Sequence, residues 1–544
     1  MSLEIPPDTC PDDAPGAREI GFSLPARFNA ASVLFDNLAR GHADRPAIHH
    51  AGGTLSYAAL CAAAARFGQG LLSLGLRRSE RVLLLLDDTP AMPIAFFGAL
   101  RAGFVPVPVN TLTPPDLLSF YLTHTGARVA VIEAGLAGIG LSEHAAGNTP
   151  LATAIIANGA APDAPPGLAV TTLEALSAGR RDTLPAADTH RDDMAFWLYS
   201  SGSTGRPKGV VHLHHDMAYT AASYADHILK LAPDDICFSV PKVFFAYGLG
   251  NSLTFPFAAG ASAVLLAGRP DPARVFAAIA AHRPTVFFGL PTLYTALAHA
   301  PEAAGADTSS LRLCISAAEV LSEEVATLWQ RRTGLPIVEG LGSTEVLHIY
   351  LSNAPDARRP GAAGRRVPGY EVSLRDPDGV AEVAAGAEGI LWVRGHSNAP
   401  GYWNRPDRTA ETMRGSGWIC TGDRFIRDAD GFHHFRGRAD DLVKVSGQWV
   451  HPMEVELCLA NHPAVREVAV LALELPDRRM TLKAWVVPAD PGADAAALTV
   501  ALQAHAKASL LPYKYPRVVE IVAEMPKTGT GKIDRVALRC CKNG

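Results

Sequence analysis

The sequence lacks several patterns that would assign it quickly to a class of protein. Its eight cysteines show no CxxC spacing of a zinc site, and Cys540 and Cys541 are neighbours near the end. We therefore expect reduced thiols, as in a cytoplasmic protein. No apolar segment reaches the roughly 18 to 20 uninterrupted residues of a membrane span. The most apolar one, Ala95 to Val109, is interrupted by Arg101 and by prolines.

The chain also lacks an excess of either charge. Its 49 Lys and Arg residues against 54 Asp and Glu residues give a formal net charge of -5, and no basic run forms a stripe for nucleic acid. The N-terminus has neither the basic region nor the apolar region of a secretion signal. We expect no nucleic acid and no membrane as partners, and a cytoplasmic location. Internal repeats and heptads are absent as well.

The chain is long, and helical patterns alternate along it with strand patterns. With 544 residues it is too long for one hydrophobic core. Pro, Asp and Gly dominate residues 1–25, so we expect a flexible N-terminus there. From Ala30 helical stretches alternate with short apolar runs such as Arg81 to Leu86, and this alternation predicts parallel sheets covered by helices. A second alternating unit is expected from about Asp193 to Val338.

The pattern changes toward the end of the chain. After Pro360 short strands and turns, such as Asp428 to Gly431, predict a small β subdomain. From Asp441 onward we expect a compact α+β domain, with helices at 452–461 and 495–509 and strands at 465–471 and 482–487. The predicted architecture is thus α/β: an N-terminal domain over 26–439, with two helix-covered parallel-type sheets and the β subdomain, and a mobile C-terminal domain over 440–544.

One run, Tyr199 to Gly209, combines three glycines, four aliphatic hydroxyls and two cations. Glycines let backbone N–H groups approach an anion, the hydroxyls donate, and the cations neutralise charge, so the run predicts a phosphate-binding loop. Lys208 is followed by Gly209 rather than by Ser or Thr, which excludes a P-loop of the GxxxxGK[ST] kind. A mobile Gly/Ser surface turn is the alternative.

Four further motifs follow in a fixed order. They are Glu339 to Glu345 (EGLGSTE), Thr421 to Asp423 (TGD), Arg436 to Val450 (RGRADDLVKVSGQWV) and Pro526 to Arg535 (PKTGTGKIDR). Together with the first run they resemble the adenylate-forming superfamily of acyl-CoA synthetases, luciferases and peptide-synthetase adenylation domains. The resemblance covers nearly the whole chain. Val240 to Asn251 and Glu345 to Asn353 resemble the benzoate-CoA ligase branch in particular.

The resemblance implies a set of ATP- and AMP-binding residues. Thr344 would contact the α-phosphate, Glu345 and Thr204 would hold Mg²⁺, and Asp423 would bind the ribose. Leu341 stands where the family usually carries an aromatic residue, so adenine stacking is expected to be weaker. The full set is Ser200, Ser201, Gly202, Ser203, Thr204, Gly205, Lys208, Ala317, Glu339, Gly340, Leu341, Gly342, Ser343, Thr344, Asp423, Arg438 and Lys532.

The resemblance also implies the residues of catalysis and of the second step. Thr344, Glu345 and Lys532 would be catalytic, with Lys532 bridging the attacking carboxylate and the α-phosphate. Asp440 would be the hinge of the C-terminal domain. Coenzyme A would be bound by Lys444, Ser446, Gly447, Gln448 and Trp449, with Gly447 lining the pantetheine tunnel. Acetylation of Lys532 is implied as a form of control.

The acyl pocket would be formed by Phe245, Ala246, Tyr247, Gly340, His348 and Ile349. Aromatic walls beside a small residue favour a flat ring over a flexible chain, although the same aromatics could merely pack the sheet. His348 could hydrogen-bond a ring substituent or simply cover the ring.

The implied activity is a two-step ligation in the degradation of aromatic compounds. Benzoate and MgATP give benzoyl-AMP and pyrophosphate, and the thiol of coenzyme A then displaces AMP. Because no carrier domain follows residue 544, we expect free coenzyme A as the acceptor. Open alternatives are ligation of hydroxybenzoate, aminobenzoate, phenylacetate or a medium-chain fatty acid, and a noncatalytic nucleotide-binding relative. A homodimer also stays open.

Overall fold

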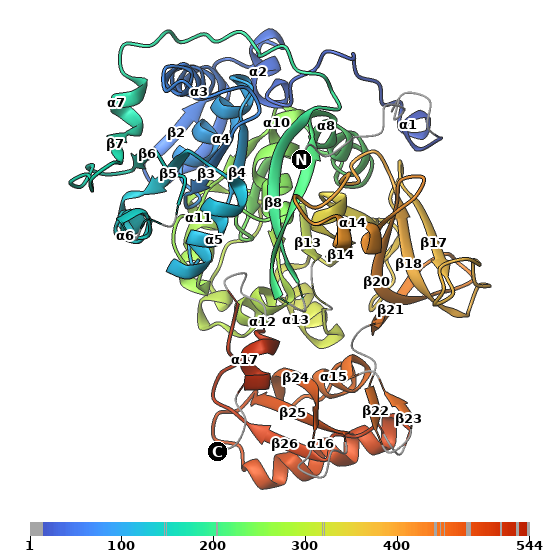
Figure 1. Cartoon of the computed structure of the whole chain (residues 1–544). Helices are drawn as coiled ribbons and strands as arrows, with labels where there is room; N and C mark the ends of the chain where they lie inside the picture. The colour runs from blue at the N-terminus through green and yellow to red at the C-terminus, as the bar shows by residue number, and fades with distance from the viewer. Residues whose placement is uncertain are drawn as a thin grey trace.

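The computed structural model in Figure 1 describes residues 15–145, 147, 149–202, 205–317, 319, 321–439, 443–445, 448–450, 452–474, 480–511, 514–528 and 533–540. Helix α1 (Pro15–Glu19) packs against the body of the molecule: Ala17 is fully buried and the Phe22 ring lies 5.0 Å from that of Tyr219. Glu19 pairs with Arg366 at 2.7 Å. The structure therefore differs from the expected loose terminus over residues 15–25, because apolar side chains in this polar segment find partners in the core.

The first sheet is fully parallel, as the alternation predicted. Its strand order is β4 (Val105–Pro108), β3 (Arg81–Leu85), β5 (Val129–Glu133), β6 (Thr153–Ala157) and β7 (Ala169–Thr172). Val82 and Leu84 join one buried cluster, and Leu83 and Leu85 join another, as the period of two along a strand requires. The covering helices are α3 (Tyr57–Leu72), α4 (Ala91–Arg101), α5 (Pro115–Thr125), α6 (Ala137–Ala145), which follows the 3-10 turn η2 (Ala134–Leu136), and α7 (Leu173–Ser177).

The second sheet has nine strands, and six neighbouring ones are parallel. The order is β16 (Arg365–Arg366), β15 (Ile349–Ser352), β14 (Ile337–Gly342), β13 (Leu313–Ala317), β12 (Val286–Gly289), β10 (Ile236–Ser239), β11 (Ser262–Val264), β1 (Pro46–His50) and β2 (Gly53–Ser56). Strands β14 through β1 run parallel, whereas β2, β15 and β16 pair antiparallel at the edges.

Helices cover both faces of this sheet. Helices α11 (Pro272–His282), α12 (Pro291–His299) and α13 (Glu323–Thr333) pack on Phe238 and Phe287. Asp271 caps α11 by accepting from the Arg274 N–H, so the helix begins where the sequence offers a capping carboxylate. The remaining helical segments are α2 (Ser32–Ala39), α8 (His214–Thr220), η3 (Ala221–Leu229), α9 (Ala246–Leu249), η4 (Gly250–Thr254), α10 (Phe255–Ala259), η5 (Pro301–Ala304) and η6 (Thr344–Val346).

The described parts of the run, Tyr199 to Gly202 and Gly205 to Gly209, lie within a two-stranded antiparallel ribbon. Strand β8 (Met194–Gly202) pairs with β9 (Gly205–Leu213), and Ser200 stands opposite Lys208. The ribbon passes through the centre of the view in Figure 1. The expected extent of the loop is thus corrected: the ladder between the two strands continues to Gly202 and Gly205, although glycine has a low preference for strands.

The small β subdomain and an α+β region follow. The first contains β17 (Glu371–Arg375), β18 (Glu388–Arg394), α14 (Pro406–Thr412), β19 (Met413–Arg414), β20 (Trp418–Arg427) and β21 (His433–Arg438). The second contains β22 (Val443–Val445), β23 (Gln448–Val450), α15 (Pro452–Ala460), β24 (Val465–Glu474), β25 (Met480–Pro488), α16 (Ala495–Ser509), β26 (Val518–Ile521) and α17 (Arg535–Cys540).

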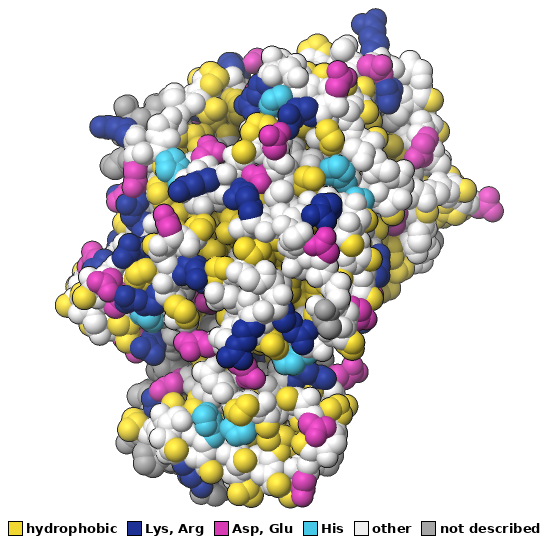
Figure 2. All heavy atoms as spheres, turned by 180° about the vertical axis from the view of Figure 1, so that it is seen from behind, with side chains coloured by type: hydrophobic (Ala, Val, Ile, Leu, Met, Phe, Trp, Pro, Cys, Tyr) yellow, Lys and Arg dark blue, Asp and Glu magenta, His cyan; other side chains and the backbone are white. Residues whose placement is uncertain are grey.

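The predicted α/β fold class is confirmed. The α+β region lies at one end of the molecule, below the rest of the chain in Figure 1. The mobility of this region and the boundary at 439/440 stay predictions, and the predicted hinge, Asp440, lies outside the described residues. In the face shown in Figure 2, basic and acidic side chains are interspersed. None of the helices in the described ranges combines the length and the hydropathy of a membrane-spanning segment.

Candidate active site

Four parallel strands of the second sheet end side by side. Ser239 of β10 pairs with Phe288, Gly289 of β12 pairs with Ser316, and Ala317 of β13 pairs with Gly340 of β14. In open α/β sheets ligands bind outside the carboxyl ends of the strands. The segment Val240 to Tyr247, Ala317 and the motif Glu339 to Glu345 therefore share one edge of the sheet, as a binding site requires.

The β8–β9 ribbon delivers its polar side chains to Glu345. The Ser200 hydroxyl donates to Glu345 Oε1 at 3.1 Å, and Lys208 Nζ lies 3.9 Å from the same oxygen. Burial lowers the pKa of Lys208, and the opposite charge of Glu345 counteracts part of that effect. A residue from the first motif and one from the second thus meet across 145 positions of sequence.

Tyr402 joins the same cluster and was missed by the sequence reasoning. Its hydroxyl donates to Glu345 Oε1 at 2.8 Å and accepts from Lys208 Nζ at 3.0 Å. The Tyr402 backbone also bridges to Val210 of β9. Tyrosine followed by Trp403 and a turn gives no pattern that distinguishes a site residue from a core aromatic.

The ribose candidates form a pair on the β subdomain. Asp423 of β20 stands opposite Arg438 of β21, and Arg438 Nη1 lies 3.1 Å from the Asp423 carboxylate. Burial raises the pKa of the Tyr350 phenol well above its usual value, and the charges of Asp423 and Glu345 add to the effect while that of Arg438 opposes it. The charges of Asp423, Arg438 and Glu345 thus all act on this one phenol.

Close approach of backbone at Gly342 and of a side chain at Gly340 leaves little room for a Cβ within the second motif. A Cβ on Gly342 would lie 2.5 Å from the His348 carbonyl oxygen, and one on Gly340 would lie 2.9 Å from Ile349 Cδ1. Burial raises the pKa of Glu339 to about 7, while its hydrogen bonds to the Gly361 and Leu321 backbone oppose that shift. Leu341 and Ser343 are half-buried, and Ala317 is 3% exposed.

The acyl candidates come together around one buried histidine. The His348 ring lies 5.5 Å from the Tyr247 ring, and its Nε2 lies 3.2 Å from Asn251 Oδ1. Burial lowers the pKa of His348 to about 3, so the imidazole is neutral at pH 7. Ala246 and Ile349 are buried, and Phe245 is half-buried beside Phe244 at a ring distance of 4.7 Å.

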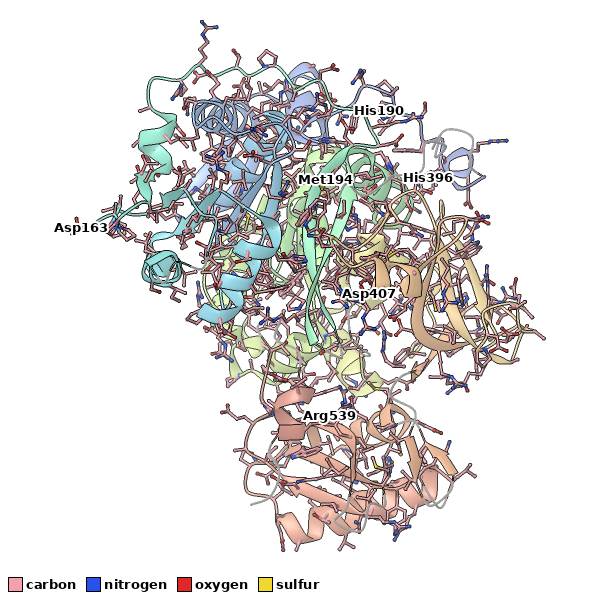
Figure 3. The ribbon with its side chains drawn as sticks, in the orientation of Figure 1. Asp163, His190, Met194, His396, Asp407 and Arg539 are labelled. Carbon is pink, nitrogen blue, oxygen red and sulfur yellow. The ribbon has the colours of Figure 1, made fainter. Side chains whose placement is uncertain are left out.

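Several predicted residues cannot be placed in the site. Ser203, Thr204, Asp440, Ser446, Gly447 and Lys532 lie outside the described residues. Only the backbone is described for Ser201, Gly202, Gly205, Lys444, Gln448 and Trp449, of which Gly202 pairs with Gly205 and Lys444 with Trp449. A bridge between Lys527 and Ile533 brackets the segment that contains Lys532. In Figure 3, Arg539 of the adjoining α17 lies on the side of the α+β region that faces the rest of the chain.

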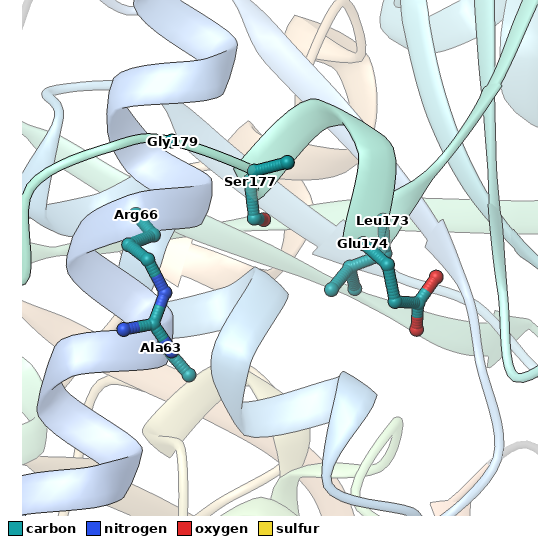
Figure 4. Close-up of a pocket in the computed structure, with 7 residues that line it drawn as sticks. Ala63, Arg66, Leu173, Glu174, Ser177 and Gly179 are labelled. Carbon is teal, nitrogen blue, oxygen red and sulfur yellow. The ribbon is translucent and has the colours of Figure 1, made fainter.

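A surface depression elsewhere contains none of the candidate site residues. It measures about 350 Å³ and lies between α3 and α7, as Figure 4 shows. Its lining residues are Ala63, Arg66, Leu173, Glu174, Ser177, Ala178 and Gly179. Arg66 is engaged there in an ion pair with Asp182. Because these elements cover the first sheet, the depression is remote from the carboxyl edge of the second.

Comparisons with known proteins identify the lineage of the fold and of its motifs. A family model described as AMP-binding enzyme matches residues 35–403, and one described as AMP-binding enzyme C-terminal domain matches residues 454–532. The benzoate–CoA ligase of Thauera aromatica is 43% identical over 520 residues, which are 95% of this chain and 96% of that protein.

Two solved structures share the fold over nearly their whole length. The anthranilate CoA ligase AuaEII in complex with anthranoyl-AMP matches with a TM-score of 0.89 at 36% identity, covering 95% of this chain and 98% of that one. A benzoate CoA ligase from Burkholderia xenovorans LB400 matches with a TM-score of 0.85 at 40% identity, covering 94% and 100%. The resemblance inferred from the motifs is confirmed.

Proposed function

The chain belongs to the AMP-binding enzyme family, and we propose that it ligates benzoate to coenzyme A. The products would be benzoyl-CoA, AMP and pyrophosphate, formed through benzoyl-AMP. The observation that carries the proposal is the convergence of Ser200, Lys208 and Tyr402 on Glu345, at the sheet edge that also carries Tyr247 and His348. The two benzoate–CoA ligases among the relatives supply the substrate class.

The first half-reaction needs groups that hold a triphosphate. A carboxylate is a poor electrophile because its oxygen is a poor leaving group, and transfer to AMP replaces that oxygen by a phosphate. Ser200 would donate to the β- and γ-phosphates and Lys208 would neutralise their charge. Thr344 would contact the α-phosphate, and Asp423 would accept hydrogen bonds from the ribose hydroxyls.

The donor set fits Mg²⁺. Glu345 presents a carboxylate that is mostly buried, and a hard oxygen ligand of this kind suits an ion that keeps waters and phosphate oxygens in its shell. Among the described residues no group of three or more His, Cys, Asp or Glu side chains could form a complete protein cage for a metal ion. When bound, Mg²⁺ would supply charge neutralisation of the triphosphate.

The second half-reaction rests on residues of the α+β region. We propose that Lys532 serves only the adenylation step and that rotation about Asp440 then presents Gly447 and its neighbours to coenzyme A. The domain division at 439/440 is part of this proposal. The two separate matches, to 35–403 and to 454–532, support it because they leave the proposed hinge between them.

A substituted benzoate is the second candidate substrate. The polar pair His348 and Asn251 beside Tyr247 favours it, since a ring hydroxyl or amino group could hydrogen-bond there. The anthranilate ligase among the solved structures supports the same candidate. Phenylacetate and medium-chain fatty acids are further alternatives.

A panel of acids tests the proposal. AMP release would be measured with ATP, coenzyme A and benzoate, the hydroxybenzoates, 2-aminobenzoate, phenylacetate or hexanoate. We expect kcat/KM for benzoate or a substituted benzoate to exceed that for hexanoate at least tenfold. The reverse order would refute the aromatic assignment. Absence of any carboxylate-dependent ATP–pyrophosphate exchange would favour a noncatalytic relative.

Location, assembly and modification are proposed separately. We propose a cytoplasmic protein, which the unpaired state of Cys61, Cys237, Cys314, Cys420 and Cys458 supports. Light scattering would test the homodimer. Mass spectrometry of the native protein would test acetylation of Lys532.

A further inference from the structure

A buried cluster of one aspartate and two histidines contacts the second motif and has no part in the proposed chemistry so far. His212 at the end of β9 and Asp216 on α8 are both fully buried. His215 is 3% exposed, and its Nδ1 lies 3.0 Å from Asp216 Oδ1. Burying charged groups is costly unless they are paired and hydrogen-bonded, so the cluster needs an explanation.

His212 links this cluster to the second motif. Its Nδ1 lies 2.8 Å from Asp216 Oδ2, and its Nε2 lies 2.9 Å from the carbonyl oxygen of Thr344. The ring also stacks on Phe196, with 5.2 Å between centroids and 23° between planes. The imidazole is therefore fixed on three sides, and one of its contacts is to a residue of the nucleotide motif.

Both ring nitrogens of His212 face groups that only accept hydrogen bonds. A carbonyl oxygen has no proton to give. Burial would raise the pKa of Asp216, but His215 and His212 hold it below its usual value, so this carboxylate is ionised. Asp216 Oδ2 also accepts from the Leu213 N–H at 3.0 Å. A protonated ring nitrogen of His212 can therefore only donate here, Nδ1 to Asp216 and Nε2 to the Thr344 carbonyl.

The turn that His212 contacts needs such external support. Residues Thr344–Val346 form one 3-10 turn, and Leu347 ends it with a φ of 71°, a left-handed conformation that is unfavourable for a side chain of this size. The three carbonyls of the turn accept hydrogen bonds from outside it. Thr344 accepts from His212, Glu345 from the Ala399 N–H at 2.8 Å, and Val346 from the Ser397 hydroxyl at 2.8 Å.

We infer that His212, held by Asp216, is a positioning residue that fixes the Thr344 carbonyl and thereby aims Thr344 and Glu345 at the phosphates and magnesium ion of MgATP. The inference rests on the proposed function, since it assigns that role to the two motif residues. His212 touches no reacting atom and acts through the backbone of the motif. Its ring approaches from the β9 strand, whereas Ala399 and Ser397 approach from the β subdomain, so the turn is clamped from two sides.

Matched variants of His212 separate positioning from mere packing. His212→Phe keeps a ring against Phe196 but has no donor. His212→Gln places an amide nitrogen where Nε2 stands and can still donate to Thr344. His433→Phe is the control, because His433 is also a buried histidine, 4% exposed, and lies beside the Gly364 carbonyl outside the proposed site.

Calorimetry with MgATP and with ATP in EDTA gives a readout that needs no acid. We expect His212→Phe to weaken MgATP binding at least tenfold and ATP binding without the ion less than threefold. In His212→Gln the affinity for MgATP should be restored by at least half of the loss seen in His212→Phe, when the dissociation constants are compared on a logarithmic scale. Benzoate-dependent ATP–pyrophosphate exchange should fall in the same order, while thioester formation from supplied benzoyl-AMP changes less than threefold.

Other outcomes overturn the inference. Unchanged MgATP binding in His212→Phe would do so, as would a His212→Gln variant that is no better than the Phe variant. Equal loss of both half-reactions, with a melting temperature lowered as in His433→Phe, would show a purely structural role. If the unmodified protein binds MgATP but activates no aromatic acid, the proposed substrate fails while the binding comparison still tests His212.

Discussion

The Tyr402 hydroxyl donates a 2.8 Å hydrogen bond to Glu345 Oε1 while accepting one from Lys208 Nζ at 3.0 Å. The Lys208 ammonium also lies 4.3 Å from the centre of the Tyr402 ring. Tyr402 is 2% exposed. One phenol thus sets the separation between the cation expected at the β- and γ-phosphates and the carboxylate expected at Mg²⁺.

Removal of that hydroxyl should lower the activity with MgATP more than it lowers the free energy of unfolding. Hydrogen bonds to charged groups contribute about 1.5–3 kcal/mol, which corresponds to roughly a 10- to 100-fold effect. We expect Tyr402→Phe to lower kcat/KM for MgATP by about that factor. Tyr57→Phe is the control, because Tyr57 is a fully buried tyrosine whose hydroxyl bonds the Ala261 carbonyl far from the site. Equal kinetic losses in both variants would contradict the assignment.

Loss of the proposed catalytic lysine should separate the two half-reactions. In Lys532→Ala, adenylation measured by ATP–pyrophosphate exchange should fall by about 100-fold or more, since a positioned charge at the transition state is removed. Conversion of supplied benzoyl-AMP to benzoyl-CoA should survive. A similar loss of both steps would refute the role of Lys532.

A side chain in the proposed pantetheine tunnel should give the inverse pattern. Gly447→Leu would obstruct the approach of the thiol, so thioester formation should fall while ATP–pyrophosphate exchange persists. Both half-reactions would be followed in the same preparation. Normal thioester synthesis by this variant would count against the tunnel.

Buried neutral histidines should make the protein sensitive to mild acid. Burial lowers the pKa of His214 and of His433 to about 4 and that of His348 to about 3. Below about pH 6.5 the unfolded chain binds protons that the folded protein excludes, so each such histidine costs about 1.4 kcal/mol of stability per pH unit. The loss grows from pH 6.5 down to the folded-state pKa.

Urea unfolding at pH 7, 6 and 5 measures this effect. In His433→Gln the free energy of unfolding should fall less steeply as the pH is lowered, by up to about 1.4 kcal/mol per pH unit. His299→Gln, at an exposed position on α12, is the control and should leave the slope unchanged. Equal stability of the unmodified protein at pH 7 and pH 5 would contradict the prediction.

Local sequence patterns were enough to predict helices and strands such as the following. The helix expected at 495–509 has those bounds in the structure, and the strand expected at 81–86 spans Arg81–Leu85. The loop expected over Tyr199 to Gly209 was too long, because pairing continues to Gly202 of β8 and Gly205 of β9 although glycine has a low preference for strands. The packing of Phe22 was missed for a similar reason, because its partner Tyr219 lies far away in the sequence.

The sequence by itself determined the parallel α/β fold, the order of the motifs and the chemistry that they resemble, since hydrophobic period and motif composition are local properties. Only the tertiary structure decided which of these groups meet. It placed Tyr402 between Lys208 and Glu345, His348 beside Tyr247, and His212 under Thr344. These contacts join residues that are 57 to 194 positions apart in the chain. They depend on how the sheets and the ribbon pack, for which no single segment carries a signal.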